Sequence, residues 1–500
     1  MLHSNPPSPF YQTLPSRQRT TPWGLLIGAT VLAFLSGAVA GLFGGLAALI
    51  ITLFLVFAMF AVGDYRFGVM LALFILPLSG TRLMPHELGG IRGLNPLNVL
   101  LAISFFSLLM TRPFMRKRLV LPTPPREVWL FLGIILFGGL LGATNVSKIP
   151  GFYQTETLQL GFDSPFAYLR DVVIRPLLYL IFAYMLSLVV ANARKPERVL
   201  IPYFISSLIL PIIVMVVVAV SGVSLSMLAS SHARNFLSRL GLHANELGLF
   251  FNMTFALGAF TWLSLRSLLA RWLLAIALGL VGLGVLLTFS RGALLGMAVI
   301  VLYFLFTARR FSLMAGMLVL MMVVAAALPS AVVERASMGF RSGNVGEISA
   351  GRVDHIWLPL LPETVTSPLV GHGMSSILWS EAARRHAILP VGHPHSAYLG
   401  VVLDFGLMGV IVVFMFYRHL WRYFSRLAEG HDNPVWRGYF RGALACILLL
   451  LVQGLTDDRF TPTFPQCGMW LAYGVAMGLN ARAAASQPKT AAAVPAPHQP

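Results

Sequence analysis

The 500-residue sequence is poor in charge and in cysteine. Only 11% of its residues are charged, whereas 57% are hydrophobic. Soluble domains carry about 25% charged residues, so this composition excludes a water-soluble fold and indicates that most of the chain lies in lipid. The two cysteines, Cys446 and Cys467, are too few for a disulfide framework or a zinc cluster.

Charge-free stretches predict the membrane-spanning helices. A span needs about 20 apolar residues, and Trp23 to Val62 is long enough for a hairpin of two helices. Twelve further stretches lie near residues 67–80, 96–111, 128–146, 172–191, 200–222, 247–265, 272–289, 293–307, 313–331, 397–417, 442–456 and 466–480. Because the shorter stretches could be re-entrant, we expect an all-α, polytopic integral membrane protein with about 12–14 transmembrane helices.

The start of the chain also resembles a secretory signal. Arg17 and Arg19 precede an apolar run that contains Ala38-Val39-Ala40. This run continues past Ala40 into a second span, which favours a retained membrane hairpin over a cleaved signal.

The basic residues are divided unevenly between the two predicted faces. With a cytoplasmic N-terminus, 22 of the 36 Lys and Arg residues but only five of the 18 Asp and Glu residues lie on the N-terminal side of the membrane. This positive-inside pattern orients that face toward the cytoplasm. The formal net charge of +18 is therefore mostly a topology signal and implies no nucleic-acid partner.

The predicted organisation has five parts. Residues 1–22 and 484–500 are rich in Pro, Ser, Ala and Gln and are expected to be disordered cytoplasmic tails. Residues 23–331 hold transmembrane helices 1–11, and residues 396–483 hold helices 12–14. The large outer loop, 332–395, contains Trp357 and Trp379 and is expected to form short helices on the membrane surface, as a lid or substrate platform.

Arginines gather on the outer face. Arg170, Arg175 and Arg291 lie at or near the outer ends of predicted helices, and the loop adds Arg335, Arg341, Arg352, Arg384 and Arg385. An ionised side chain inside a span is costly without a partner, so Arg175 is a functional candidate, with snorkelling as the alternative reading for Arg175 and Arg291. Guanidinium groups bind phosphate oxygens bidentately, so such a cluster suits a diphosphate attached to a lipid.

The same loop contains five histidines: His355, His372, His386, His393 and His395. They lack the His-Glu-x-x-His spacing of a helical metal site, and His393-Pro394-His395 is too tight for a simple chelate, so we expect no metal site. A histidine just before a span, as His395 is, could act as a general base near neutral pH. An ordinary interfacial histidine is the alternative.

Three segments resemble the O-antigen ligase and polymerase superfamily of membrane glycan transferases. In the first, Thr288–Ala293, Ser-Arg-Gly stands at the entry to a membrane helix. The second runs from Gly351-Arg352 and Trp357 to Ser367–Gly373, and the third is His395-Ser396 followed by Gly-Leu-Met-Gly at 406–409. The resemblance covers roughly residues 230–420.

The resemblance implies en bloc transfer of a glycan from a polyprenyl (undecaprenyl) diphosphate by a metal-independent, inverting glycosyltransferase without a cofactor. By resemblance, Arg175, Arg291 and Arg352 would bind the diphosphate and His395 would be the catalytic base. Arg170, His372 and His393 are further substrate-site candidates. The enzyme would lie in the bacterial inner (cytoplasmic) membrane, with its active site and the large loop facing the periplasm.

The acceptor is left open. A polymerase would extend O-antigen or exopolysaccharide, a ligase would attach the polysaccharide to lipid A core, and a protein O-oligosaccharyltransferase would modify Ser or Thr. The extra N-terminal spans favour a polymerase, as do Val410 and Ile411, where ligases often have threonines. The spacing after His395 favours a ligase.

Expected partners are the lipid-linked donor, a glycan, lipid A core or protein acceptor, the lipid bilayer and other polysaccharide assembly proteins. A secondary transporter or lipid flippase is the alternative from another class. Transporters place ionisable residues near the membrane midplane, whereas here only Arg175 and Asp404 lie clearly inside predicted spans.

Overall fold

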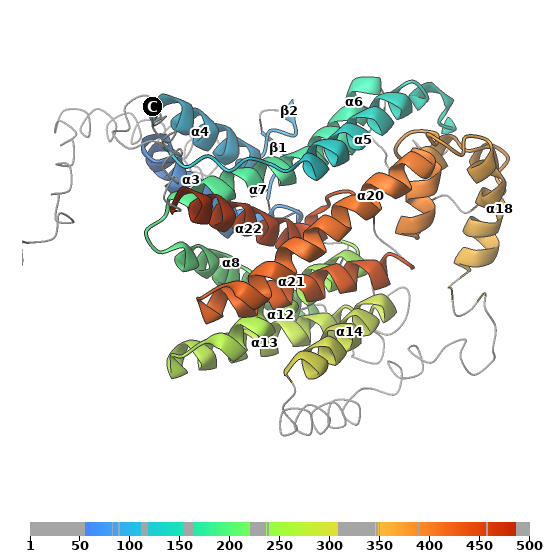
Figure 1. Ribbon diagram of the computed structural model, residues 1–500. Helices are drawn as coiled ribbons and strands as arrows, with labels where there is room; N and C mark the ends of the chain where they lie inside the picture. The colour runs from blue at the N-terminus through green and yellow to red at the C-terminus, as the bar shows by residue number, and fades with distance from the viewer. Residues whose placement is uncertain are drawn as a thin grey trace, which may run out of the picture.

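The structure is a computed structural model, and it describes residues 56–82, 84–88, 91–111, 119–151, 153, 162, 164–220, 237, 240–308, 346, 349, 351–388, 391–456 and 459–486. This part of the chain is an all-α bundle, as the sequence predicts (Figure 1). The tail 1–22, most of the hairpin 23–62, the predicted span 313–331, most of the tail 484–500, and Arg335 and Arg341 of the large loop lie outside the described residues.

The longer helices are α3 (Tyr65–Ile75), α4 (Pro96–Thr111), α5 (Arg126–Ala143), α7 (Arg175–Asn192), α9 (Ile209–Val220), α12 (Ala244–Ser264), α13 (Leu268–Leu287), α14 (Arg291–Ala308), α20 (Ala397–Gly430), α21 (Pro434–Gln453) and α22 (Cys467–Ser486). The shorter helices are α6 (Pro165–Leu169), α8 (Leu200–Ser206), α18 (Leu358–Leu360) and α19 (Glu381–Arg384). Strands β1 (Glu87–Leu88) and β2 (Ile91–Arg92) pair antiparallel, with Glu87 opposite Arg92.

Seven helical segments of the described chain are long and apolar enough to cross a membrane: Arg126–Ala143, Pro165–Asn192, Pro196–Val220, Ala244–Ser264, Leu268–Leu287, Ala397–Gly430 and Pro434–Gln453. Shorter apolar helices cover Tyr65–Leu78, Pro96–Met110 and Arg291–Thr307. Charge-free length is what a span requires, and the predicted stretches within the described residues fall largely on these helices and on α22.

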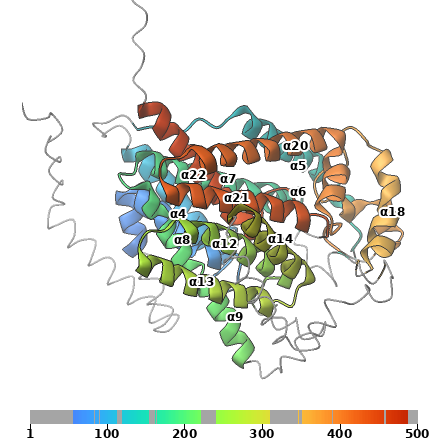
Figure 2. The ribbon, with the colours of Figure 1, turned by 60° about the horizontal axis from the view of Figure 1, so that its bottom comes forward.

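Two helix pairs pack through glycine faces. Gly438 and Gly442 of α21 lie against α12, and Gly474 and Gly478 of α22 lie against α7; Figures 1 and 2 show both pairs side by side. A Cβ on the second glycine of either pair would lie within 2.7 Å of a carbonyl oxygen of the partner helix. Since lipid is as apolar as a leucine side chain, helices associate in membranes through such close backbone packing.

Helix α20 is broken at Gly406, whose backbone has φ 61° and ψ −157°. Four hydrogen bonds close the break: His372 and Gly373 donate their N–H groups to the carbonyl oxygens of Leu403 and Asp404, and Leu407 and Met408 donate theirs to Pro368 and Leu369. Free backbone polar groups are costly in a membrane, so a broken helix needs partners of this kind.

The described part of the large loop contains short helices, among them α18 and α19. Its residues 373–380 are buried in the protein. The N–H group of Met374 also donates to the carbonyl oxygen of Gly138 in α5, at 2.9 Å. This part of the loop packs between α5 and α20 because the break in α20 leaves backbone groups that it satisfies.

Candidate active site

A cavity of about 2000 Å³ lies where many helix ends meet. Its walls include the C-terminal end of α21, the N-terminal ends of α4, α7, α12 and α14, and the large loop. These are the helix ends that the predicted topology places on the outer face. Six predicted site residues line the cavity: Arg170, Arg175, Arg291, Arg352, His393 and His395.

The seventh, His372, does not line this cavity. Its Nε2 atom lies 3.0 Å from Thr366 Oγ1 and 3.0 Å from the carbonyl oxygen of Glu363. Together with its backbone bond to α20, this arrangement makes His372 part of the segment that closes the break.

Arg170 is the first residue of a π-helical turn, Arg170–Ile174, and Arg175 directly follows this turn. Pro176 has no N–H group and its ring crowds the carbonyl four residues earlier, and here the helix widens so that the Arg175 N–H bonds to the Arg170 carbonyl. Such turns are frequent at functional sites. Arg170 pairs with Asp171 through two hydrogen bonds of 3.1 and 2.9 Å, whereas Arg175 is exposed to the cavity.

Arg352 precedes a second π-helical turn, Val353–Trp357. Pro359 follows this turn at the same spacing as Pro176 follows the first. The Arg352 guanidinium donates to the carbonyl oxygen of Thr456, and this bond ties the large loop to the end of α21.

Arg291 is the first residue of α14. Ser290 caps this helix by accepting the Ala293 N–H at 3.2 Å, and its hydroxyl donates to Asn245 Oδ1 at 2.6 Å. Gln453 donates to the Gly292 carbonyl at 2.8 Å and fixes the same turn from α21. The N-terminus of α14 therefore faces the cavity with its partial positive charge, which favours an anion there.

His395 has a positive φ of 50°, which is strained for a residue other than glycine. Its N–H donates to Nδ1 of His393 at 3.3 Å, and the centroids of the two imidazole rings lie 4.1 Å apart. Because Nδ1 accepts, a neutral His393 carries its proton on Nε2. Trp357 Nε1 donates to the Pro394 carbonyl at 2.8 Å and holds the segment in place.

Arginine dominates the charge of the cavity. Five arginines and three carboxylates line it, and one of these carboxylates, Asp171, is paired with Arg170. The pKa of His86 lies below its usual value, first because of burial and then because of Arg175 and Arg82. The excess of guanidinium groups suits a multiply charged anion.

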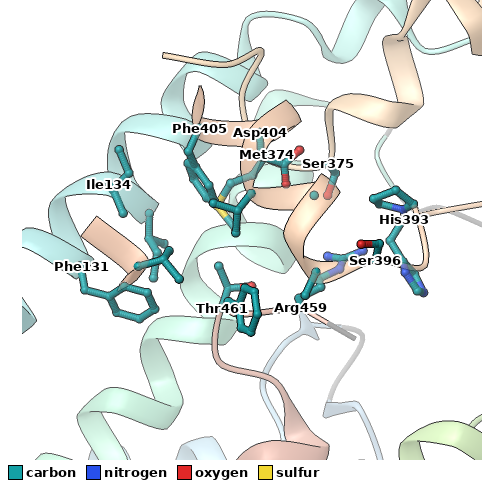
Figure 3. Close-up of a pocket in the computed structure, with 17 residues that line it drawn as sticks. Phe131, Ile134, Met374, Ser375, His393, Ser396, Asp404, Phe405, Arg459 and Thr461 are labelled. Carbon is teal, nitrogen blue, oxygen red and sulfur yellow. The ribbon is translucent and has the colours of Figure 1, made fainter. Parts of the chain in front are cut away.

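A second, smaller cavity of about 30 Å³ lies behind the histidines. Figure 3 shows Asp404, Ser375, His393, Ser396 and Arg459 around it. Four residues line both cavities and separate them: Met374, His393, Arg459 and Thr461.

The sequence analysis did not single out Arg459, His86 or Asn245. Arg459 follows α21 in the segment between two predicted spans, and its Nη2 donates to the Gly392 carbonyl at 3.2 Å. Arg459 lies on the predicted outer face, where arginines gather, and that position could have identified it. The sequence holds no comparable signal for His86 and Asn245, which reach the cavity through tertiary packing.

Within the described ranges, no three His, Cys, Asp or Glu side chains gather as ligands for a metal ion. Cations, a helix N-terminus and a strained histidine meet at one large cavity. Guanidinium groups and a helix N-terminus favour an anion, and an imidazole can exchange a proton.

Residues 276–414 match the family described as O-antigen ligase. The matched region covers most of α13, all of α14, the large loop and the first half of α20, and it contains Arg291, Arg352, His393 and His395. No curated protein matches the chain. The resemblance to the O-antigen ligase superfamily that the sequence motifs indicate is therefore confirmed, over residues 276–414.

Proposed function

We propose that this protein transfers a glycan en bloc from a polyprenyl (undecaprenyl) diphosphate to an acceptor hydroxyl at the periplasmic face of the bacterial inner membrane. We assign it an O-antigen or exopolysaccharide polymerase-like reaction in surface polysaccharide synthesis. The main support for this proposal is that one cavity is lined by four predicted site residues from separate parts of the chain: Arg175, Arg291, Arg352 and His395.

The size and wall of the cavity support two large substrates. Pockets for drug-sized ligands measure about 300–1,000 Å³, whereas this cavity measures about 2000 Å³. Apolar residues such as Leu97, Phe166 and Ile174 share its wall with the arginines. A lipid diphosphate and a glycan acceptor could therefore meet there.

The proposed reaction needs a base and a site for a leaving diphosphate. His395 takes the proton of the acceptor hydroxyl, and the hydroxyl oxygen attacks the anomeric carbon of the donor sugar from the face opposite the diphosphate. The bond between this carbon and the phosphate oxygen breaks, and its electron pair goes to the diphosphate. Arg175, Arg291 and Arg352 stabilise the growing negative charge as fixed cations, so the transfer inverts the anomeric centre without a metal ion.

A ligase that attaches polysaccharide to lipid A core is the second candidate. The matched family is described as O-antigen ligase, which favours it. Val410 and Ile411, the departure from many ligases, are 39% and 50% exposed on the outside of the bundle and do not line the cavity. Their identity therefore says little about the acceptor.

The test is mass analysis of polyprenyl-diphosphate-linked glycans in a strain that lacks the protein, complemented with wild type, Arg291→Ala or His395→Ala. For a polymerase, single repeat units accumulate in the null strain and in both variants. Full-length chains on the carrier together with bare lipid A core would instead identify a ligase, and such chains with unglycosylated protein an oligosaccharyltransferase.

Two variants in the same loop serve as matched controls. Arg384 is exposed and paired with Glu381, and His355 is exposed and does not line the cavity. Arg384→Ala and His355→Ala should restore the wild-type pool. An unchanged carrier pool in the null strain would contradict glycan transfer and favour transport.

A further inference from the structure

We propose that Asp404 and Arg459 form an internal charge pair that positions the His393–His395 segment and controls how readily His395 takes up a proton. The proposal rests on the proposed function, because it gives both residues a role through His395. Neither residue would touch the reacting atoms, so both are positioning residues.

The two cavities place this pair directly behind the histidines. Asp404 lines only the smaller cavity, whereas Arg459 and His393 line both (Figure 3). A volume of about 30 Å³ has room for about two water molecules. Asp404 and His393 line this cavity together, so a charge on Asp404 can act on the histidine segment through it.

Asp404 is held rigidly. It lies two residues before the break at Gly406, and its Oδ1 accepts hydrogen bonds from the N–H group of Ser376 at 3.0 Å and from its hydroxyl at 2.8 Å. A carboxylate inside a membrane helix is costly unless it has a partner, which makes it a functional candidate. Arg459, which lines the same small cavity, supplies an opposite charge.

Arg459 connects this charge to the histidine segment. Its guanidinium holds the carbonyl of Gly392, which directly precedes His393, at 3.2 Å. Its own carbonyl accepts from the Gln466 side chain, so the arginine is fixed from the short turn that precedes α22. With Trp357 bound to the Pro394 carbonyl, the segment is held on both sides of His393.

The pair solves an electrostatic problem of the proposed reaction. The arginines that bind a diphosphate also oppose the imidazolium that forms when His395 accepts a proton. The negative charge of Asp404 offsets part of this opposition, and Arg459 limits the offset. The other charged or titratable groups around the two cavities are His86, Glu87, Tyr168, Arg170, Asp171, Arg175, Tyr179, His243, Glu246, Arg291 and Arg352.

The test compares two charge-removing variants by the pH profile of kcat/KM. Purified protein in vesicles receives the polyprenyl-diphosphate-linked glycan fraction extracted from a strain that lacks it. Asp404→Asn removes a negative charge and should move the acid limb to lower pH and reduce kcat. Arg459→Gln removes a positive charge and should move the acid limb to higher pH. Each shift should be at least about 0.5 pH unit.

Three comparisons separate this role from a structural one. Asp404→Asn with Arg459→Gln should return the acid limb toward the wild-type position, because the two shifts have opposite signs. Ser376→Ala removes a hydrogen bond to Asp404 but no charge, so it should leave the acid limb in place. Asp432→Asn makes the same change at an exposed site at the far end of α20 and should leave both kcat and the profile unchanged.

Thermal unfolding of the same preparations in detergent shows that each variant is folded. If the wild type transfers glycan but the acid limbs of the two single variants are not shifted, this inference is overturned and the proposed function is not. Shifts of the same sign in both would also overturn it. No transfer by the wild type would overturn the proposed function together with the inference.

Discussion

Nδ1 of His393 accepts the backbone N–H of His395 at 3.3 Å, and His395 has a left-handed φ of 50°. A left-handed backbone costs a non-glycine residue of order 1 kcal/mol or more and persists only where its surroundings enforce it. The His393 side chain is one of the groups that enforce it here. His393 therefore fixes the direction in which the proposed base points.

Replacing His393 should act through this hydrogen bond. Asn can accept the N–H two residues later in an Asx turn, whereas Ala cannot. We expect His393→Ala to lower kcat by about tenfold or more, in line with the cost of misplacing a catalytic group, and His393→Asn to retain most of the activity. Equal losses in the two variants, measured with the extracted donor, would contradict this role.

The π-helical turn at Arg170–Ile174 gives a second prediction. Pro176→Ala restores an N–H group, which allows a regular helix and turns Arg170 and Arg175 relative to the cavity. The variant should raise KM for the lipid-linked donor more than it lowers kcat. Pro434→Ala is the control, since proline at the first turn of α21 costs no hydrogen bond. A regular helix with an unchanged KM would show that the turn is not required.

The lowered pKa of His86 predicts a pH effect on binding. Burial, Arg175 and Arg82 lower this pKa, so the imidazole is neutral at pH 7. A bound diphosphate counteracts the arginines and favours the protonated form, so binding takes up a proton and strengthens as pH falls through the titration range of this imidazole. Because the ligand itself titrates, the measured quantity is the difference between wild type and His86→Asn in undecaprenyl diphosphate binding. Parallel pH curves for both proteins would exclude His86.

The glycine faces predict a difference in stability between two similar substitutions. Gly442 packs against the α12 backbone, whereas nothing lies within 4 Å of a Cβ at Gly279 of α13. Gly442→Ala should lower the free energy of unfolding by about 1–3 kcal/mol through overpacking, and Gly279→Ala should leave it unchanged or raise it slightly. Thermal unfolding of the two variants in detergent measures this; equal midpoints would contradict the packing argument.

Much of the helical architecture could be predicted because a membrane span leaves a long, charge-free signature in the sequence. Six of the arginines and histidines that line the cavity also stand out in the sequence, as Arg175 and Arg291 do, because they lie on the outer face of a positive-inside protein. The local sequence does not encode which helix ends meet in space. For this reason the cavity itself, and the contribution of His86, emerge only from the fold.

Two local features were present in the sequence but not interpreted from it. Pro176 and Pro359 each follow an arginine-bearing segment, yet a proline alone does not reveal whether a helix ends, kinks or forms a π turn. Gly406 lies in a recognised motif, but its break depends on the backbone of residues 368–373, which reaches it across the fold. The burial of residues 373–380 follows from the same tertiary contact.

The most direct test of the proposed function is release of undecaprenyl diphosphate by purified protein in vesicles that contain the extracted lipid-linked glycan. The wild type should release it in step with the appearance of a longer or transferred glycan, without added metal and with a chelator present. Arg291→Ala should bind the lipid-linked glycan weakly, and His395→Ala should bind it normally. Neither variant should release undecaprenyl diphosphate. Release by His395→Ala at the wild-type rate would contradict the assignment of the base and the account built on it.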